Sequence, residues 1–94
     1  MESFYIITNQ LKDRDYSVTI EIKDYIERKG KYVILAQKDE EGFIVPGTIP
    51  ENVDCGLVLG GDGTLIRAIR DLEGNKLPLL GINIGTLGYL ADVE

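Results

Sequence analysis

The sequence predicts a three-layer α/β domain built on a short, mostly parallel sheet. Four short apolar runs, at residues 4–8, 32–36, 55–59 and 77–84, alternate with two segments whose apolar residues recur at helical spacing. The runs are hydrophobic at nearly every position, which is typical of strands covered on both faces. At 94 residues the chain has the length of a single domain. We expect the strand order 2-1-3-4.

The first half of the chain predicts a strand, a helix and a second strand. Between residues 4–8 and 32–36, Asp13 and Asp15 are typical of a helix start, and Gly30 is typical of a helix end. The crossover that joins the two parallel strands is expected to be right-handed. Apolar residues recur every four positions along the helix, at Val18, Ile22 and Ile26.

Residues 37–54 interrupt the alternation of strands and helices. The charged run at residues 38–42 is typical of a solvated loop, and Pro46 and Pro50 indicate turns. We predict that these turns flank at most one short extra strand, at residues 43–45.

Residues 55–74 predict a third strand, a glycine loop and a second helix. Cys55 is interpreted as a small buried hydrophobe, and Gly74 as the end of the helix. Backbone N–H groups at such a helix start are unpaired, and the glycines before it let an anion approach them. The predicted apolar face of the helix comprises Leu65, Ile66, Ile69 and Leu72.

An aspartate lies within this glycine loop. The carboxylate of Asp62 would repel a bare phosphate oxygen by about 4 kcal/mol at 4 Å in an effective dielectric of 20. A site that only binds phosphate would therefore not be expected to contain this carboxylate. The residue is better explained if it faces a magnesium ion on the phosphates, or takes the proton of a hydroxyl that attacks phosphorus.

Three loops are expected at one edge of the sheet. Residues 9–10, 60–63 and 83–89 each follow a predicted strand, and the carboxyl ends of parallel strands form the ligand edge of open α/β sheets. The arrangement is Rossmann-like, with the expected site where these loops meet.

Composition limits the possible partners. The net charge is −6, the pI is near 4.6, and lysine and arginine form no block, which argues against nucleic acid and anionic membranes as ligands. No apolar stretch has the length of a membrane span. One cysteine and no histidine exclude an internal disulfide and a zinc site, so we expect a reducing, cytoplasmic location and no metal-ligand set in the chain itself.

Two common nucleotide motifs do not fit the glycine loop. A Walker A loop needs Gly-Lys-Ser/Thr at the helix start, but Gly61 is followed by Asp62 and the next lysine is Lys76. The dinucleotide fingerprint needs a third glycine or alanine where Ile66 stands, and an acidic residue after the next strand where Asn83 stands.

The segment from Gly60 to Arg67 resembles the nucleotide-phosphate loop of the NAD kinase family. Gly81 to Leu90 is similar to the second signature of that family's N-terminal domain, and Asn9 to Asp13 to its first-strand exit. The four-residue Gly-Gly-Asp-Gly core alone is shared with diacylglycerol, sphingosine and 6-phosphofructokinases. The resemblance covers nearly all 94 residues, but only the first of the family's two domains.

This resemblance implies roles for individual residues. Asp62 would accept the proton of the NAD ribose 2′-hydroxyl as it attacks the γ-phosphate of ATP, which binds with Mg²⁺. Arg67 would contact the dinucleotide, and Tyr89 matches a position, usually phenylalanine, that lines the adenine pocket. Polyphosphate could replace ATP as donor. The implied binding residues are Gly60, Gly61, Asp62, Gly63, Arg67 and Tyr89.

The chain stops a few residues after the second signature, so we expect it to be the N-terminal domain of a two-domain kinase. The family's β-rich C-terminal domain, which grips the nicotinamide riboside, would be absent. The isolated domain would then be inactive, and the intact enzyme is expected to be a homo-oligomer that acts on NAD and ATP.

The same residues also permit other interpretations. The chain could belong to a lipid or sugar kinase of the same superfamily, or form a non-catalytic nucleotide-binding or oligomerisation module. Asp62 or Thr64 could cap the second helix, and Asn9 could form an Asx turn. Arg67 could be a solvated helix residue, and Tyr89 a core residue.

Overall fold

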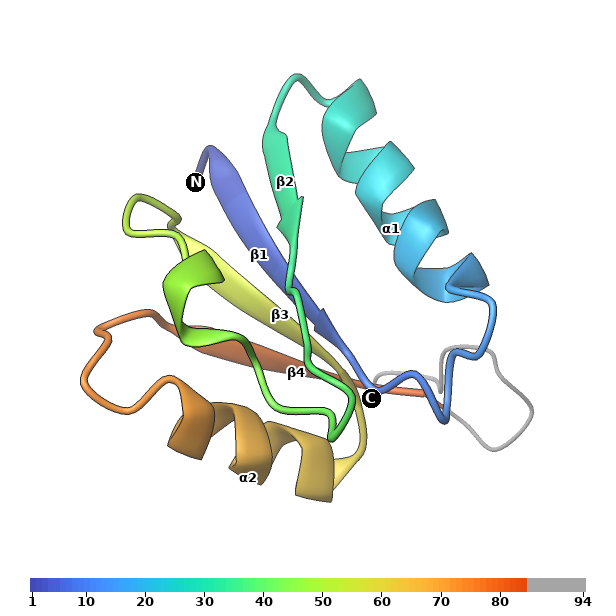
Figure 1. Cartoon of the computed structure of the whole chain (residues 1–94). Helices are drawn as coiled ribbons and strands as arrows, with labels where there is room; N and C mark the ends of the chain where they lie inside the picture. The colour runs from blue at the N-terminus through green and yellow to red at the C-terminus, as the bar shows by residue number, and fades with distance from the viewer. Residues whose placement is uncertain (85–94) are drawn as a thin grey trace.

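A computed structural model of the chain describes residues 1–84 and contains one sheet of four parallel strands (Figure 1). The strand order is β2-β1-β3-β4, which confirms the predicted order and fold class. The strands are β1 (Ser3–Thr8), β2 (Tyr32–Leu35), β3 (Cys55–Gly60) and β4 (Leu79–Asn83).

Two helices cover opposite faces of the sheet (Figure 1). Helix α1 (Ser17–Arg28) packs Ile22 and Ile26 against a cluster on one face, where Ile6 and Leu59 are buried. Helix α2 (Asp62–Asp71) and the segment after β2 cover the other face. The buried cluster on that side comprises Tyr5, Ile7, Ile44, Val58, Ala68 and Leu72.

An aspartate four residues before α1 binds the first backbone N–H groups of the helix. The buried Asp13 carboxylate accepts hydrogen bonds from the backbone N–H groups of Val18 at 3.2 Å and Thr19 at 2.9 Å. The Thr19 hydroxyl donates to the same carboxylate at 2.7 Å and lies 2.7 Å from the Thr8 hydroxyl at the end of β1. Asp13 therefore satisfies helix-start donors, as predicted from its residue type, and ties α1 to the sheet.

Residues 37–54, which interrupt the alternation of strands and helices, form no regular strand. A single antiparallel bridge joins Lys38 and Ile44, and a short 3₁₀ turn, η1 (Pro46–Thr48), follows. This confirms the prediction of turns around at most a short strand. Ile44 is buried because the segment folds back across the sheet beside α2 (Figure 1).

The predicted apolar face of α2 is wrong at two positions. Leu65 and Leu72 face the sheet together with Ala68, whereas Ile66 and Ile69 are each 55% exposed. The rotation of the helix is set at its first turn, where Thr64 packs directly on Gly60. That contact aligns Leu65, Ala68 and Leu72 with the sheet.

The structure agrees with the prediction for Cys55 and differs from the prediction for the last strand. Cys55 is buried as predicted, and burial raises the pKa of its thiol, with the neighbouring Asp54 carboxylate adding to the effect. Strand β4 is shorter than the predicted run of residues 77–84. The predicted glycine turn at residues 85–89 lies outside the described residues.

Candidate functional site

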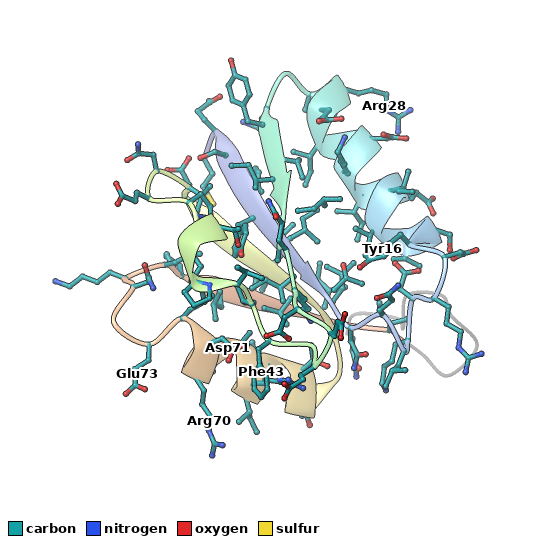
Figure 2. The ribbon with its side chains drawn as sticks, viewed as in Figure 1. Tyr16, Arg28, Phe43, Arg70, Asp71 and Glu73 are labelled. Carbon is teal, nitrogen blue, oxygen red and sulfur yellow. The ribbon has the colours of Figure 1, made fainter. Side chains whose placement is uncertain are left out.

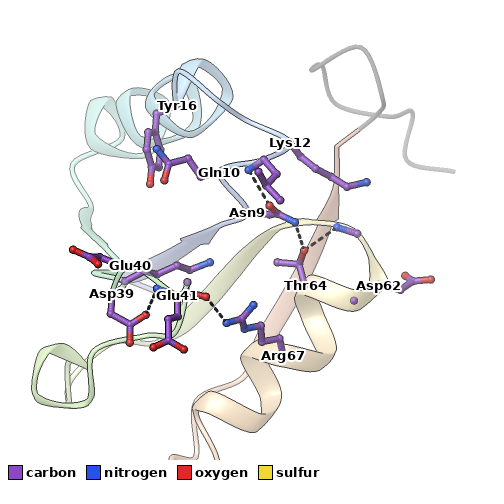
Figure 3. A pocket seen from close by; sticks show the side chains of 15 residues that line it. Asn9, Gln10, Lys12, Tyr16, Asp39, Glu40, Glu41, Asp62, Thr64 and Arg67 are labelled. Carbon is purple, nitrogen blue, oxygen red and sulfur yellow. Dashed lines mark hydrogen bonds between the residues drawn. The ribbon is translucent and has the colours of Figure 1, made fainter.

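A cleft of about 690 Å³ lies at the carboxyl edge of the sheet (Figure 3). Three chain segments line it: residues 9–12 after β1, residues 38–42 after β2, and residues 61–67 at the start of α2. Tyr16 closes one side. The structure thus brings together two of the three predicted loops, and adds the segment after β2, which we interpreted only as a solvated loop.

The glycine loop forms the end of β3 and the start of α2. The Ile84 N–H donates to the Gly60 carbonyl at 3.0 Å, which pairs the loop with the strand that ends beside it. A Cβ at Gly60 would lie 2.7 Å from the Cβ of Thr64, so this glycine is required by packing within the chain. A Cβ at Gly63 would meet nothing within 4 Å. The described residues therefore leave space in front of Gly63 that a ligand could use.

Thr64 connects the glycine loop to the loop after β1. Its hydroxyl oxygen accepts a hydrogen bond from Asn9 Nδ2 at 3.0 Å and one from the Gly61 N–H at 3.4 Å. Asn9 Oδ1 accepts from the Leu11 N–H at 3.0 Å, which is the predicted Asx turn. Asn9 thus also cross-links two loops 55 residues apart, a role that the sequence did not reveal.

Asp62 is the first residue of α2 and is exposed. Its carboxylate is directed away from the loop that carries Glu40 and Glu41 (Figure 3). Within residues 1–84 no side chain caps α2 from its N-cap position, which Gly61 occupies, and the Gly61 N–H is instead satisfied by Thr64. Capping therefore involves Thr64, and the Asp62 carboxylate remains available to a ligand at the positive end of the helix dipole.

Arg67 contacts the chain itself in this structure. Its guanidinium donates to the Glu41 carbonyl at 3.0 Å and lies 4.1 Å from the centre of the Phe43 ring. Phe43 lies beside α2, while Arg70 and Glu73 point into solvent (Figure 2). The predicted contact of Arg67 with a dinucleotide is not tested by this arrangement, which leaves the guanidinium at the cleft wall.

Two lysines at the cleft were not singled out in the sequence. Lys12 Nζ lies 3.6 Å from the position that a Cβ on Gly61 would take. Lys38 Nζ donates to the Thr8 carbonyl at 2.8 Å. Burial lowers the pKa of Lys38, the nearby Arg67 charge lowers it further, and Asp71 opposes the shift. Lys12 could have been recognised as a site residue from the sequence, because it lies in the loop after the first predicted strand, close to Asn9.

The far wall of the cleft is acidic. Asp39 Oδ1 accepts hydrogen bonds from the N–H groups of Glu41 and Phe43, both at 2.9 Å, so its carboxylate holds the turn. Glu40 and Glu41 are exposed beside it. The cleft therefore combines a helix N-terminus and Lys12 at one end with carboxylates at the other.

The described residues form neither a metal-ligand cluster nor a membrane-spanning helix. Within the part of the chain that the structure describes, no group of three or more His, Cys, Asp or Glu side chains could hold a metal ion. In the same part, no helix is both long and apolar enough to span a membrane. Of the predicted site residues, Gly61, Asp62, Gly63 and Arg67 line the cleft, Gly60 ends the strand that leads to it, and Tyr89 lies outside the described residues.

Comparisons with known proteins identify relatives along the whole chain. Residues 36–94 match the family model described as the ATP-NAD kinase N-terminal domain. The chain is 42% identical over 100 residues to an NAD kinase of Lachnospira eligens and 46% identical over 100 residues to one of Agathobacter rectalis, in both cases across 100% of this chain. These matches cover 34% and 35% of the two relatives, so the chain spans about a third of their length. No solved structure matches it significantly.

Proposed function

Because the chain belongs to the NAD kinase family, we propose that it supplies the phosphate-binding part of an enzyme that converts NAD to NADP. The phosphate donor would be ATP or polyphosphate. The observation that carries this proposal is the exposed Asp62 carboxylate at the N-terminus of α2, beside a glycine whose surroundings leave room for a ligand. The family match includes this loop.

The proposed reaction is a phosphoryl transfer to an alcohol. The 2′-oxygen of the NAD ribose forms a bond to the γ-phosphorus of ATP, and the bond between that phosphorus and the β–γ bridging oxygen breaks. ADP leaves with the bonding electrons, and the hydroxyl proton passes to the Asp62 carboxylate. Positioning and charge stabilisation supply most of the rate enhancement in such reactions.

The chain's carboxylates are consistent with a magnesium ion that arrives with ATP. Magnesium at nucleotide sites is held mainly by phosphates and water, with one or two protein carboxylates. Asp62 is an exposed carboxylate at the cleft, and no site of three or more ligands exists among residues 1–84. Mg²⁺ would neutralise phosphate charge there, and Asp62 could face it or the sugar hydroxyl.

The other residues implied by the family resemblance are proposed to bind the nucleotides or to shape the loop. The backbone N–H groups near Gly61 and Gly63 would bind phosphate, while Gly60 allows Thr64 to pack and thereby shapes the loop. Arg67 would contact the dinucleotide from the cleft wall, and Tyr89 would line the adenine pocket.

The relatives' greater length suggests where the rest of the site is found. We propose that the nicotinamide riboside is held by sequence beyond these 94 residues, and that the chain alone is inactive. The complete enzyme is proposed to be a cytoplasmic homo-oligomer. Calorimetric titration of the 94-residue chain with NAD, and with ATP plus magnesium, should give weak binding or none.

Replacement of Asp62 by asparagine tests the proposal. In the full-length gene product, we expect Asp62→Asn to shift the melting temperature by no more than about 2 °C, because the carboxylate is exposed and the lost helix-dipole interaction is small. NAD phosphorylation should be abolished, since an amide is a far poorer base than a carboxylate. Thermal unfolding and a coupled NADP assay measure the two effects.

Substrate profiling separates the alternatives. Turnover that survives in Asp62→Asn would rule out the base assignment. Phosphorylation of a lipid or a sugar in place of NAD would indicate another kinase of the superfamily. Tight nucleotide binding without any turnover would indicate a non-catalytic module.

A further inference from the structure

The two ends of the cleft have different chemistry. One end has the N-terminus of α2 and the Lys12 ammonium, which is close to Gly61. The other end is formed by residues 39–41, which contribute three carboxylates. Among the described residues, the Glu40 and Glu41 carboxylates take part in no ion pair and no hydrogen bond, so both can interact with a ligand.

We propose that the phosphate donor binds along this cleft as a nucleotide, with its phosphates at the glycine loop and its nucleoside against Tyr16 and residues 39–41. The inference rests on the proposed function, and it selects ATP over polyphosphate. A polyphosphate chain is anionic along its whole length and would place charge beside Glu40 and Glu41. A nucleoside is neutral and offers hydroxyl and amino donors that carboxylates accept.

Tyr16 supplies an aromatic surface at the right place. Its half-buried side chain lines the cleft and lies beside Gln10, across from the loop that carries Glu40 (Figure 3). The residue is held on both sides, since its N–H donates to the Asp13 carbonyl at 3.0 Å and its carbonyl accepts from the Ile20 N–H at 2.8 Å. Stacking of a base on such a ring tolerates different bases and needs no further side chain.

The acidic wall is fixed in position by contacts that leave its carboxylates exposed. Arg67 holds the wall through the Glu41 backbone carbonyl and the Phe43 ring, and the Asp39 carboxylate closes the turn. Arg67 is therefore also a positioning residue for this wall. The volume of about 690 Å³ lies within the range of sites that enclose small ligands.

A Tyr16→Asn variant tests where the nucleoside lies. Tyr16 has a left-handed backbone (φ 59°), which asparagine adopts readily, so the substitution removes the ring without straining the chain. We expect the ratio of the Kd for ATP to the Kd for tripolyphosphate, both with magnesium, to rise about tenfold in the full-length gene product. Tyr25→Asn, on the exposed part of α1, is the matched control and should leave the ratio unchanged.

Charge removal on the opposite wall provides a second, independent test. The double variant Glu40→Gln, Glu41→Gln keeps the backbone contact to Arg67 and should lower the Kd for tripolyphosphate severalfold, while ATP binds no more tightly. Asp39 is left unchanged because its carboxylate holds the turn. Glu73→Gln, at a residue that does not line the cleft and points into solvent (Figure 2), is the control.

Calorimetry and activity together separate this inference from the proposed function. An unchanged ratio in Tyr16→Asn, or equal weakening of both ligands, would overturn the placement of the nucleoside. Wild-type protein that binds tripolyphosphate more tightly than ATP would overturn it as well. Ring-dependent ATP binding without phosphorylation of NAD would support the placement and refute the proposed kinase activity.

Discussion

At the scale of single residues, two glycines at the junction of β3 and α2 serve different purposes: Gly60 ends the strand and Gly63 lies in the first turn of the helix. Neither Gly60 nor Gly63 has a positive φ, so backbone freedom does not explain them. A Cβ on Gly60 would collide with Thr64, whereas a Cβ on Gly63 would enter open space. The first glycine is therefore needed for the fold, and the second is available for a ligand.

The two glycines should respond differently to alanine. We expect Gly60→Ala to lower the free energy of unfolding by about 1–3 kcal/mol, because Thr64 and the first turn of α2 must shift. Gly63→Ala should leave it unchanged or raise it by up to about 1 kcal/mol, since alanine is the better helix former. Urea denaturation measures both effects.

Gly63→Ala should weaken ATP binding, although it should not lower stability. Its added methyl group occupies the space through which phosphates would reach the backbone N–H groups, so the Kd for ATP in the full-length protein should rise. Unaltered ATP affinity in Gly63→Ala would show that the phosphates do not approach here. Gly47→Ala, at a turn with nothing within 4 Å of a Cβ and outside the cleft, is the control.

The buried hydroxyl of Tyr5 destabilises the folded state. It is fully buried beneath α2, and its hydroxyl has no hydrogen-bond partner in the part of the chain that the structure describes. We expect Tyr5→Phe to raise the free energy of unfolding, by up to about 2 kcal/mol, because the desolvated hydroxyl is removed and the ring is kept.

The increase in the free energy of unfolding caused by Tyr5→Phe should be larger at alkaline pH. Burial raises the pKa of Tyr5 above its ordinary value of 10.0, so above that pH the unfolded state loses the proton while the folded state keeps it. Wild-type stability therefore falls as the pH rises past 10, and the phenylalanine variant avoids this loss. Urea denaturation at pH 7 and pH 10.5 would contradict the interpretation if the tyrosine protein were the more stable at both.

At the scale of elements, α1 depends on a residue outside it. Asp13 accepts three hydrogen bonds at the start of the helix, whereas the exposed Asp15 accepts one, from the Ser17 N–H at 3.0 Å. We expect Asp13→Ala to lower the free energy of unfolding by about 2–3 kcal/mol, since it leaves buried donors unsatisfied.

Asp15→Ala is the matched control for this prediction. It removes one exposed hydrogen bond and should cost at most about 1 kcal/mol. Far-ultraviolet circular dichroism with urea denaturation compares the two variants. Equal losses would mean that the buried network with Thr19 and Thr8 adds nothing to capping.

At the scale of the whole molecule, one side of the structure exposes apolar surface. Ile66 and Ile69 lie on α2, which packs against β3 and β4, and Leu80 of β4 is 56% exposed. Within residues 1–84 no strand pairs with the outer edge of β4. Open edges and exposed apolar side chains favour association between chains.

The 94-residue chain should therefore self-associate at high concentration. Light scattering should show a mass above that of the monomer, and the double variant Ile66→Glu, Ile69→Glu should reduce it. Ile20→Glu, at a similarly exposed residue of α1, should have little effect. A strict monomer at high concentration would contradict this prediction.

By itself, the sequence determined the order of strands and helices, the parallel sheet, the aspartates that precede the first helix and the place of the glycine loop. Each of these depends on local pattern, because strand length, helical spacing and turn residues are read over a few positions. The family resemblance was likewise carried by short motifs. The roles of Asp62 and Tyr89 remain predictions.

The tertiary structure alone decided which faces and loops meet. The rotation of α2, which exposes Ile66 and Ile69, follows from the contact between Thr64 and Gly60. The link from Asn9 to Thr64 and the attachment of Arg67 to the loop after β2 join residues 55 and 26 positions apart. Such contacts leave no periodic trace in the sequence, since they depend on how the strands bring distant loops to one edge of the sheet.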